Sequence, residues 1–229
     1  METRTTAELI RRLSKKNRVI MLGGLAVIAH GLSRSTYDAD VWLDPTLPVE
    51  SWSRVVNSLL SDNECLRILS ISNWKEVESE RLSEIIMRDG VIRITGANQP
   101  LDLFRAPNEL DMEEFDAVWS RAIPLDDGAR IPDAIDLLVT KQATGRDKDL
   151  MDIAFLEAKA EREYLEKLPT ASTVQVEKML ERFLTPKISE VVLRHPEPSV
   201  RDFALRFLQE QAADGDPFAR DILNSTNPV

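Results

Sequence analysis

The sequence predicts an α/β core followed by a helical C-terminal region. Two observations predict the core: short apolar runs with the alternation of β-strands recur along the first two thirds of the chain, and segments with helical spacing lie between them. A third observation sets the boundary, because helical spacing continues from Ile131 almost to the end, interrupted near prolines such as Pro169 and Pro186. We therefore expect one domain over residues 1–155 and a helical region over residues 156–229.

The individual elements follow from this spacing. Residues 8–14 place Leu9, Ile10 and Leu13 on one side of a helix, and residues 49–60 repeat apolar side chains at helical intervals after two prolines. Residues 91–95 alternate as a strand does, and the turn that follows should pair them with a strand at residues 101–104. Further helices are expected at residues 25–32 and 111–119, further strands at 19–22, 41–43, 66–71 and 122–125, and either structure at 74–88.

Composition narrows the class of protein. The net charge of −10 argues against extensive binding of nucleic-acid backbones. No apolar run is long enough to span a membrane, and residues 1–17 lack the apolar stretch of a secretory signal. Cys65 is the single cysteine, which excludes an internal disulfide and fits a reducing compartment. We therefore expect a cytoplasmic protein.

Residues 21–44 carry the strongest functional signal. Gly23 and Gly24 follow a predicted strand and open a helix, where backbone N–H groups can approach phosphates closely. Asp38 and Asp40 are two residues apart on a predicted strand, so their carboxylates project from the same face. Paired carboxylates offer the hard oxygen ligands that Mg²⁺ prefers. Together the two features indicate nucleotide chemistry.

Metal-assisted phosphoryl chemistry calls for a third carboxylate, and Asp102 is the best candidate. It lies between apolar residues on a predicted strand beside a hairpin turn. An acidic side chain within so short an apolar strand is costly unless it is paired or bound to metal. The alternative is an exposed strand aspartate opposite a basic residue.

The order of these residues resembles the DNA polymerase β-type nucleotidyltransferase superfamily. The matching elements are Gly23-Gly24, Arg34-x-Thr36-x-Asp38-x-Asp40 and Asp102. A second block is similar to a helix of the AbiEii-like, toxin-type bacterial nucleotidyltransferases, and its residues are Lys141, Arg146, Lys148, Asp149 and Asp152. The resemblance covers roughly residues 8–160 and implies a mixed β-sheet flanked by helices.

The resemblance also implies roles for these residues. Asp38 and Asp40 would bind Mg²⁺ (or Mn²⁺) at the triphosphate of an NTP, and Asp102 would join a second metal near the attacking hydroxyl. The residues implied to contact the nucleotide are Gly23, Gly24, Arg34, Thr36, Lys141, Arg146 and Lys148. Asp149 and Asp152 share one helix face, which fits catalysis and a structural network equally well.

The implied activity is transfer of an NMP from an NTP to a hydroxyl acceptor, which could be RNA, a protein or a small molecule. Because toxin-type relatives act beside an antitoxin, one interpretation is the toxin of a toxin–antitoxin or phage-defence pair with a cognate antitoxin. A second is a non-catalytic nucleotide-binding or protein-interaction module on the same fold, although three clustered carboxylates speak against it. A third is a small-molecule (aminoglycoside-type) nucleotidyltransferase, since residues 45–149 hold 20 acidic and 12 basic residues and acidic walls attract cationic substrates.

Overall fold

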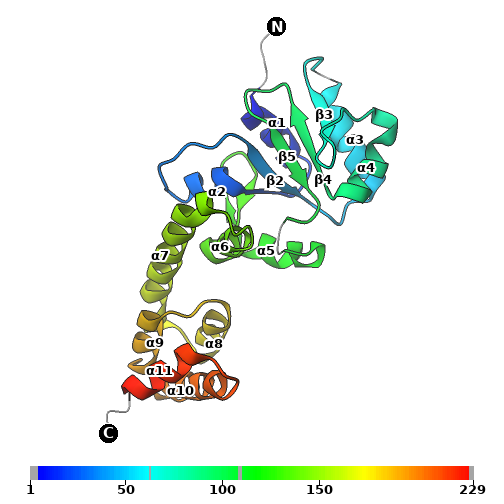
Figure 1. Ribbon diagram of the computed structural model, residues 1–229. Helices are drawn as coiled ribbons and strands as arrows, with labels where there is room; N and C mark the ends of the chain where they lie inside the picture. Colours follow the sequence, from blue (N-terminus) through cyan, green and yellow to red (C-terminus); the bar gives the residue numbers. More distant parts are fainter. Residues whose placement is uncertain (1–4, 62, 108–109, 227–229) are drawn as a thin grey trace. The chain divides into compact units, whose positions relative to one another are not determined.

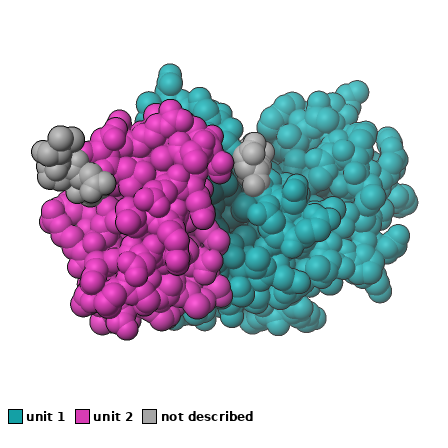
Figure 2. Space-filling view, turned by 90° about the horizontal axis from the view of Figure 1, so that it is seen from below, with its two compact units in different colours: residues 1–156 teal, residues 157–229 magenta. Residues whose placement is uncertain are grey.

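A computed structural model describes residues 5–61, 63–107 and 110–226 of the chain. The chain divides into two units, Met1–Leu156 and Glu157–Val229, which Figure 2 shows in different colours. The first unit holds the β-sheet and the second is helical in its described part. No helix in the described residues is both long and apolar enough to cross a membrane.

Seven strands form one mixed sheet in the described part of the first unit, in the order β3-β4-β5-β2-β1-β7-β6. β1 pairs with β7 and β2 with β5 in parallel, and the other neighbouring pairs are antiparallel. The strands are β1 (Val19–Leu22), β2 (Ala39–Leu43), β3 (Arg67–Ser70), β4 (Val91–Thr95), β5 (Leu101–Phe104), β6 (Ile123–Pro124) and β7 (Arg130–Ile131). This mixed sheet, with its flanking helices and the helical region after it, confirms the predicted fold class.

Helices cover both faces of the sheet (Figure 1). One face packs against α1, α3 and α4 around the buried Trp52, and the other packs Ile20 and Trp42 against Phe115 of α5. The helices of this unit are α1 (Thr6–Ser14), α2 (Gly23–Ala29), α3 (Val49–Leu60), α4 (Leu82–Asp89), α5 (Phe115–Arg121) and α6 (Ala134–Gln142). Short 3₁₀ turns lie at η1 (Ser79–Arg81), η2 (Met112–Glu114) and η3 (Asp147–Asp149).

The register of three strands places polar residues in one row across the sheet. Arg93 of β4 lies opposite Asp102 of β5, and Asp102 lies opposite Asp40 of β2. Alternation puts this row on the face that carries Trp42, whereas Ile92, Ile94, Leu101 and Leu103 point to the opposite core. The sheet thus brings residues far apart in the sequence onto one surface.

Most predicted elements are present, but several have shifted bounds. The helix expected at residues 111–119 is η2 followed by α5, which ends at Arg121. The helix expected at residues 25–32 is α2, which begins at Gly23 and ends at Ala29. The helix expected from Ile131 begins at Ala134 instead, because Ile131 belongs to β7 and pairs with β6. The ambiguous residues 74–88 contribute η1 and most of α4. A two-residue strand such as β7 is too short for periodicity to reveal.

Helix α7 (Leu150–Lys167) begins in the first unit and ends in the second. The second unit continues with η4 (Leu168–Thr170), α8 (Thr173–Arg182), α9 (Pro186–Leu193), α10 (Pro198–Ala213) and α11 (Pro217–Thr226). His195 lies between α9 and α10 and is buried, and both of its ring nitrogens have a hydrogen-bond partner. Nε2 lies 2.9 Å from the carbonyl oxygen of Leu168, and Nδ1 accepts from the backbone N–H of Glu197 at 3.1 Å. This histidine therefore fixes a loop.

Candidate functional site

Three carboxylates meet at the row of polar residues. Asp38, Asp40 and Asp102 each present an oxygen within 4.8 Å of the other two. Asp40 and Asp102 are register neighbours on β2 and β5, and Asp38 precedes β2 by one residue, so alternation turns it to the same side as Asp40. Ligands at about 2.0–2.6 Å from one shared cation lie at separations of this order. The donor set and its spacing therefore fit a hard divalent cation.

Burial and the two neighbouring carboxylates destabilise the charged form of Asp40. The pKa of Asp40 is raised to about 6, first because burial disfavours its charge and then because Asp38 and Asp102 repel it. The cations Lys141 and Arg146 act in the opposite direction but do not cancel this effect. A bound cation would relieve the repulsion.

Arg93, which the sequence analysis did not select, touches two of the three carboxylates. Its Nε and Nη2 donate to the two oxygens of Asp102 at 2.7 and 2.6 Å, and Nη2 also lies 3.3 Å from an oxygen of Asp38. The ring of Trp74 covers the guanidinium at 5.1 Å. The alternative considered for Asp102, a strand aspartate opposite a basic residue, is therefore correct about the partner, but Asp102 is buried rather than exposed.

The two glycines leave room for the neighbouring polar side chains. Gly23 has φ +57°, and a Cβ atom there would lie 1.8 Å from Oδ2 of Asp40. A Cβ atom at Gly24 would lie 2.5 Å from Oγ1 of Thr36. Only glycine fits at Gly23, since it combines a left-handed backbone with this close approach. The Gly-Gly pair therefore lets α2 begin against the carboxylates.

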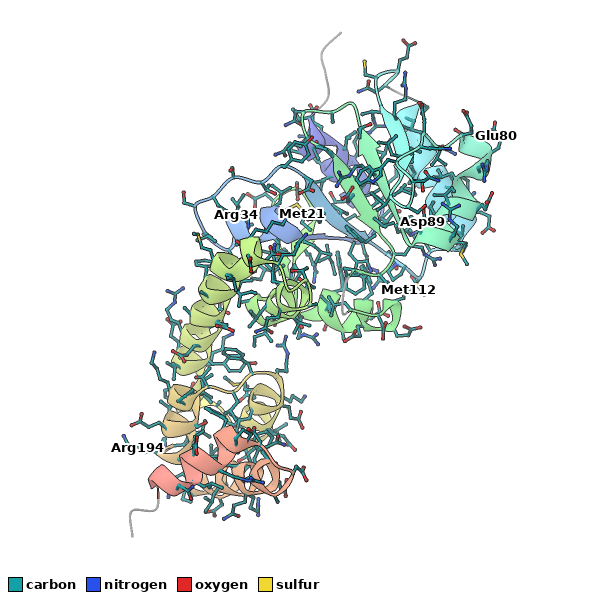
Figure 3. All side chains as sticks on the ribbon, viewed as in Figure 1. Met21, Arg34, Glu80, Asp89, Met112 and Arg194 are labelled. Carbon is teal, nitrogen blue, oxygen red and sulfur yellow. The ribbon has the colours of Figure 1, made fainter. Side chains whose placement is uncertain are left out.

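A buried ionic network lies on the other side of the site. Lys141 Nζ is 3.0 Å from Asp149 Oδ1 and 2.9 Å from Asp152 Oδ2, and all three side chains are almost fully buried. Arg34 pairs with Asp152 from the segment between α2 and β2, beside the first turns of α7 (Figure 3). Arg146 Nε is 2.7 Å from Asp149 Oδ2 while half of its side chain stays exposed. The network ties the segment before β2 to α6 and α7.

Residues from both the carboxylate cluster and the ionic network line one cleft of about 640 Å³. The cleft wall holds every residue that the sequence analysis assigned to the metal or the nucleotide: Gly23, Gly24, Arg34, Thr36, Asp38, Asp40, Asp102, Lys141, Arg146 and Lys148. Asp149 also lines the cleft, whereas Asp152 does not. Lys148 is exposed there, whereas Arg34, Lys141 and Arg146 are held by aspartates. Arg93 and Thr144 also line the cleft. The signal that could have found Arg93 is its place on the strand predicted to pair with that of Asp102.

Comparison with known proteins identifies no family. No family model and no curated protein matches the chain. Among solved structures, it is similar to the crystal structure of a "putative nucleotidyltransferase from H. pylori", with a TM-score of 0.42 and 14% sequence identity over 98% of this chain and 95% of that chain. A likeness this weak carries no weight for activity or for the AbiEii-like subfamily. Function has to be inferred from the site itself.

Gly23→Ala should destabilise the first unit more than Gly145→Ala. Both glycines have φ +57°, but a Cβ atom at Gly145 meets nothing within 4 Å, whereas one at Gly23 meets Asp40. The left-handed backbone costs about 1–2 kcal/mol in either variant, and crowding at Gly23 adds about 1–3 kcal/mol. Denaturant unfolding measures both free energies. Equal losses would show that the approach of Asp40 does not constrain this turn.

Asp149→Asn should make the stability of the protein less sensitive to acid. Burial alone would raise the pKa of Asp149, but hydrogen bonds from Thr144, Lys141 and Arg146 outweigh it and lower the pKa to about 2. A carboxylate with a lowered pKa stabilises the folded state above its unfolded pKa, and this stabilisation disappears as the pH falls through the folded value. Between pH 6 and pH 2 the wild type should therefore lose about 2 kcal/mol more than the variant.

Unfolding curves of both proteins across this pH range make the comparison. Asp147→Asn is the matched control, since Asp147 is an exposed member of the same η3 turn. A difference between the wild type and Asp149→Asn that stays constant with pH would contradict the role given to the network.

Proposed function

We propose that this chain is a divalent-metal-dependent nucleotidyltransferase that moves an NMP from an NTP to a hydroxyl acceptor. The observation that carries the proposal is the meeting of Asp38, Asp40 and Asp102 within 4.8 Å, in a cleft whose wall also holds cationic side chains and the Gly-Gly turn. A carboxylate cluster suits metal ions, and the cationic wall suits phosphates. A nucleoside triphosphate with its bound cation matches both groups, because its cation would meet the carboxylates and its phosphates would meet the cationic side chains.

Mg²⁺ or Mn²⁺ held by Asp38, Asp40 and Asp102 would stabilise the attacking and leaving oxygens of an in-line displacement. The spacing of these carboxylates supports this assignment, because one cation can reach an oxygen of each. Asp38, with a third of its side chain exposed, offers the most open oxygens to a cation that enters from solvent.

The triphosphate side of the cleft is assigned to the residues around the Gly-Gly turn. Gly23 and Gly24 let the side chains of Asp40 and Thr36 approach the start of α2 closely, which places this turn directly beside the carboxylate cluster. Lys148 is free to follow the substrate because it is exposed, whereas Lys141 and Arg34 supply charge fixed in place by Asp152. A cavity of about 640 Å³ lies in the usual range for a ligand of this size.

The reaction balances as a substitution at phosphorus. The acceptor oxygen forms a bond to the α-phosphorus, the bond from that phosphorus to the bridging oxygen breaks, and pyrophosphate leaves with the electron pair. The hydroxyl proton passes to a carboxylate of the cluster and then to water. Positioning and charge stabilisation account for most of the catalysis in such transfers, which fits a site built mainly from charged side chains.

The acceptor and the biological role belong to the same proposal. RNA, protein and small-molecule hydroxyls are the three candidate acceptors, and a toxin with a cognate antitoxin is the role that the sequence motifs favour. Labelled NTPs with Mg²⁺, incubated with total RNA, with protein extract or with purified aminoglycosides, distinguish the acceptors. Nucleotide binding without labelling of any fraction would favour the non-catalytic module instead.

Asp40→Asn should lower the rate of NMP transfer by on the order of 10²–10³-fold or more while the fold survives, because it removes charge from the cluster without removing volume. Release of labelled pyrophosphate measures the rate, and circular dichroism checks the fold. The matched control is Asp126→Asn, at an exposed position outside the cleft. Near-normal transfer by the Asp40 variant would refute the mechanism.

Lys148→Ala should weaken NTP binding by about ten- to hundredfold with little change in melting temperature, because Lys148 is exposed and lines the cleft. Calorimetric titration gives the affinity and a thermal melt gives the stability. Lys75→Ala, at an exposed site outside the cleft, is the control. Unchanged affinity with a large fall in melting temperature would instead place Lys148 in a structural network.

A further inference from the structure

Arg93 contacts the carboxylate cluster directly, through hydrogen bonds to two of its three members. It lies directly opposite Asp102 in the β4–β5 register, and its Nε and Nη2 atoms hold both oxygens of that carboxylate. Nη2 reaches a second carboxylate, Asp38, at 3.3 Å. Only 16% of the Arg93 side chain and 8% of the Asp102 side chain are exposed. A partly buried two-point pair of this kind is far better fixed than a surface ion pair.

The ring of Trp74 covers the guanidinium of Arg93. Its ring lies 5.1 Å from the guanidinium carbon, at a distance where a cation and an aromatic face attract. Trp74 has φ +58° and is the one residue other than glycine with positive φ in the described chain. A large side chain holds that backbone conformation only when its surroundings enforce it. Backbone hydrogen bonds from Trp74 to Ser70 and from Ser70 to Lys75 hold the turn in this position.

The consequence is a fixed positive charge inside a metal-binding cluster. Arginine keeps its charge at any physiological pH. Three ionised carboxylates and one guanidinium carry a net charge of −2, which one divalent cation neutralises. A second divalent cation would then have to enter a neutral cluster that already contains Arg93. A triphosphate brings the negative charge that such a second cation needs.

We propose that Arg93 is a built-in counter-charge that limits the substrate-free carboxylate cluster to one divalent cation, so that a second binds only together with the triphosphate. The inference rests on the proposed function, since it assigns the cluster to metal. It makes Arg93 a positioning residue that acts through Asp102 and Asp38. The Nε and Nη2 atoms of Arg93 donate to Asp102 and Asp38, which belong to the cluster itself. The cations on the phosphate side pair with Asp149 or Asp152 instead, outside the cluster.

Counting bound Mn²⁺ by electron paramagnetic resonance tests the proposal without any activity assay. Wild-type protein, Arg93→Gln and Arg93→Lys are titrated with Mn²⁺ at pH 8, first alone and then with a non-hydrolysable NTP analogue. Both variants lose the two-point pairing with Asp102, but only Arg93→Gln loses the charge. Arg81→Gln, which removes a charge from an exposed pair with Glu84, is the control for charge loss elsewhere.

We expect one Mn²⁺ per wild-type chain without nucleotide and two with the analogue. Arg93→Gln should bind its first Mn²⁺ about ten- to hundredfold more tightly and take up a second without nucleotide, whereas Arg93→Lys and Arg81→Gln should keep a count of one. If Arg93→Gln does not fold, Arg93→Met replaces it as the uncharged variant.

A count of one or zero in the uncharged variant, or a count of two in the nucleotide-free wild type, overturns the inference and leaves the proposed function intact. Wild-type protein that binds no Mn²⁺, with or without the analogue, overturns the proposed function itself.

Discussion

Mutual repulsion among three carboxylates is the constraint around which the first unit is arranged. Asp40 and Asp102 are neighbours in the ladder between β2 and β5, and Asp38 directly precedes β2, so the backbone places the three carboxylates side by side with oxygens within 4.8 Å of one another. Burial and this repulsion together raise the pKa of Asp40 to about 6. Such a cluster persists in a folded protein only if positive charge is placed close to it. Arg93 supplies it from the neighbouring strand β4.

On the opposite wall of the cleft, the buried charge is a cation that carboxylates surround. The ammonium group of the buried Lys141 lies between Asp149 and Asp152, so it has a carboxylate partner on two sides. Removing one partner from such a buried ion pair typically costs about 3–5 kcal/mol of folding free energy, because the remaining charge is left buried without compensation. Because Arg34 joins Asp152, the segment that leads into the carboxylate strand is held by the same network. Stability and the geometry of the site are therefore coupled through Asp152.

The sequence predicted the strands that position the site better than the contacts within it. β1, β4 and β5 have the predicted bounds, and Asp102 was recognised because an acidic residue is unusual within an apolar strand. Arg93 was missed because its meaning depends on which residue faces it across the hairpin, and that register is set by the turn. The helix α4 stayed ambiguous because it is only eight residues long, and packing against α3 rather than local preference decides its structure.

The segment from Arg146 to Asp149 shows why sequence alone could not separate binding from structure. From the sequence, Asp149 fitted catalysis and a structural network equally well, whereas Arg146 and Lys148 were expected to face the cleft. The η3 turn contains both an internal network residue and an exposed residue of the cleft. It turns Asp149 inward to Lys141 and leaves Lys148 exposed on the cleft. Arg146 takes part in both, because its Nε atom binds Asp149 while half of its side chain remains exposed. The network therefore holds cationic side chains at the cleft. Lys148 is the residue at which a contribution to the cleft can be separated from a contribution to the network.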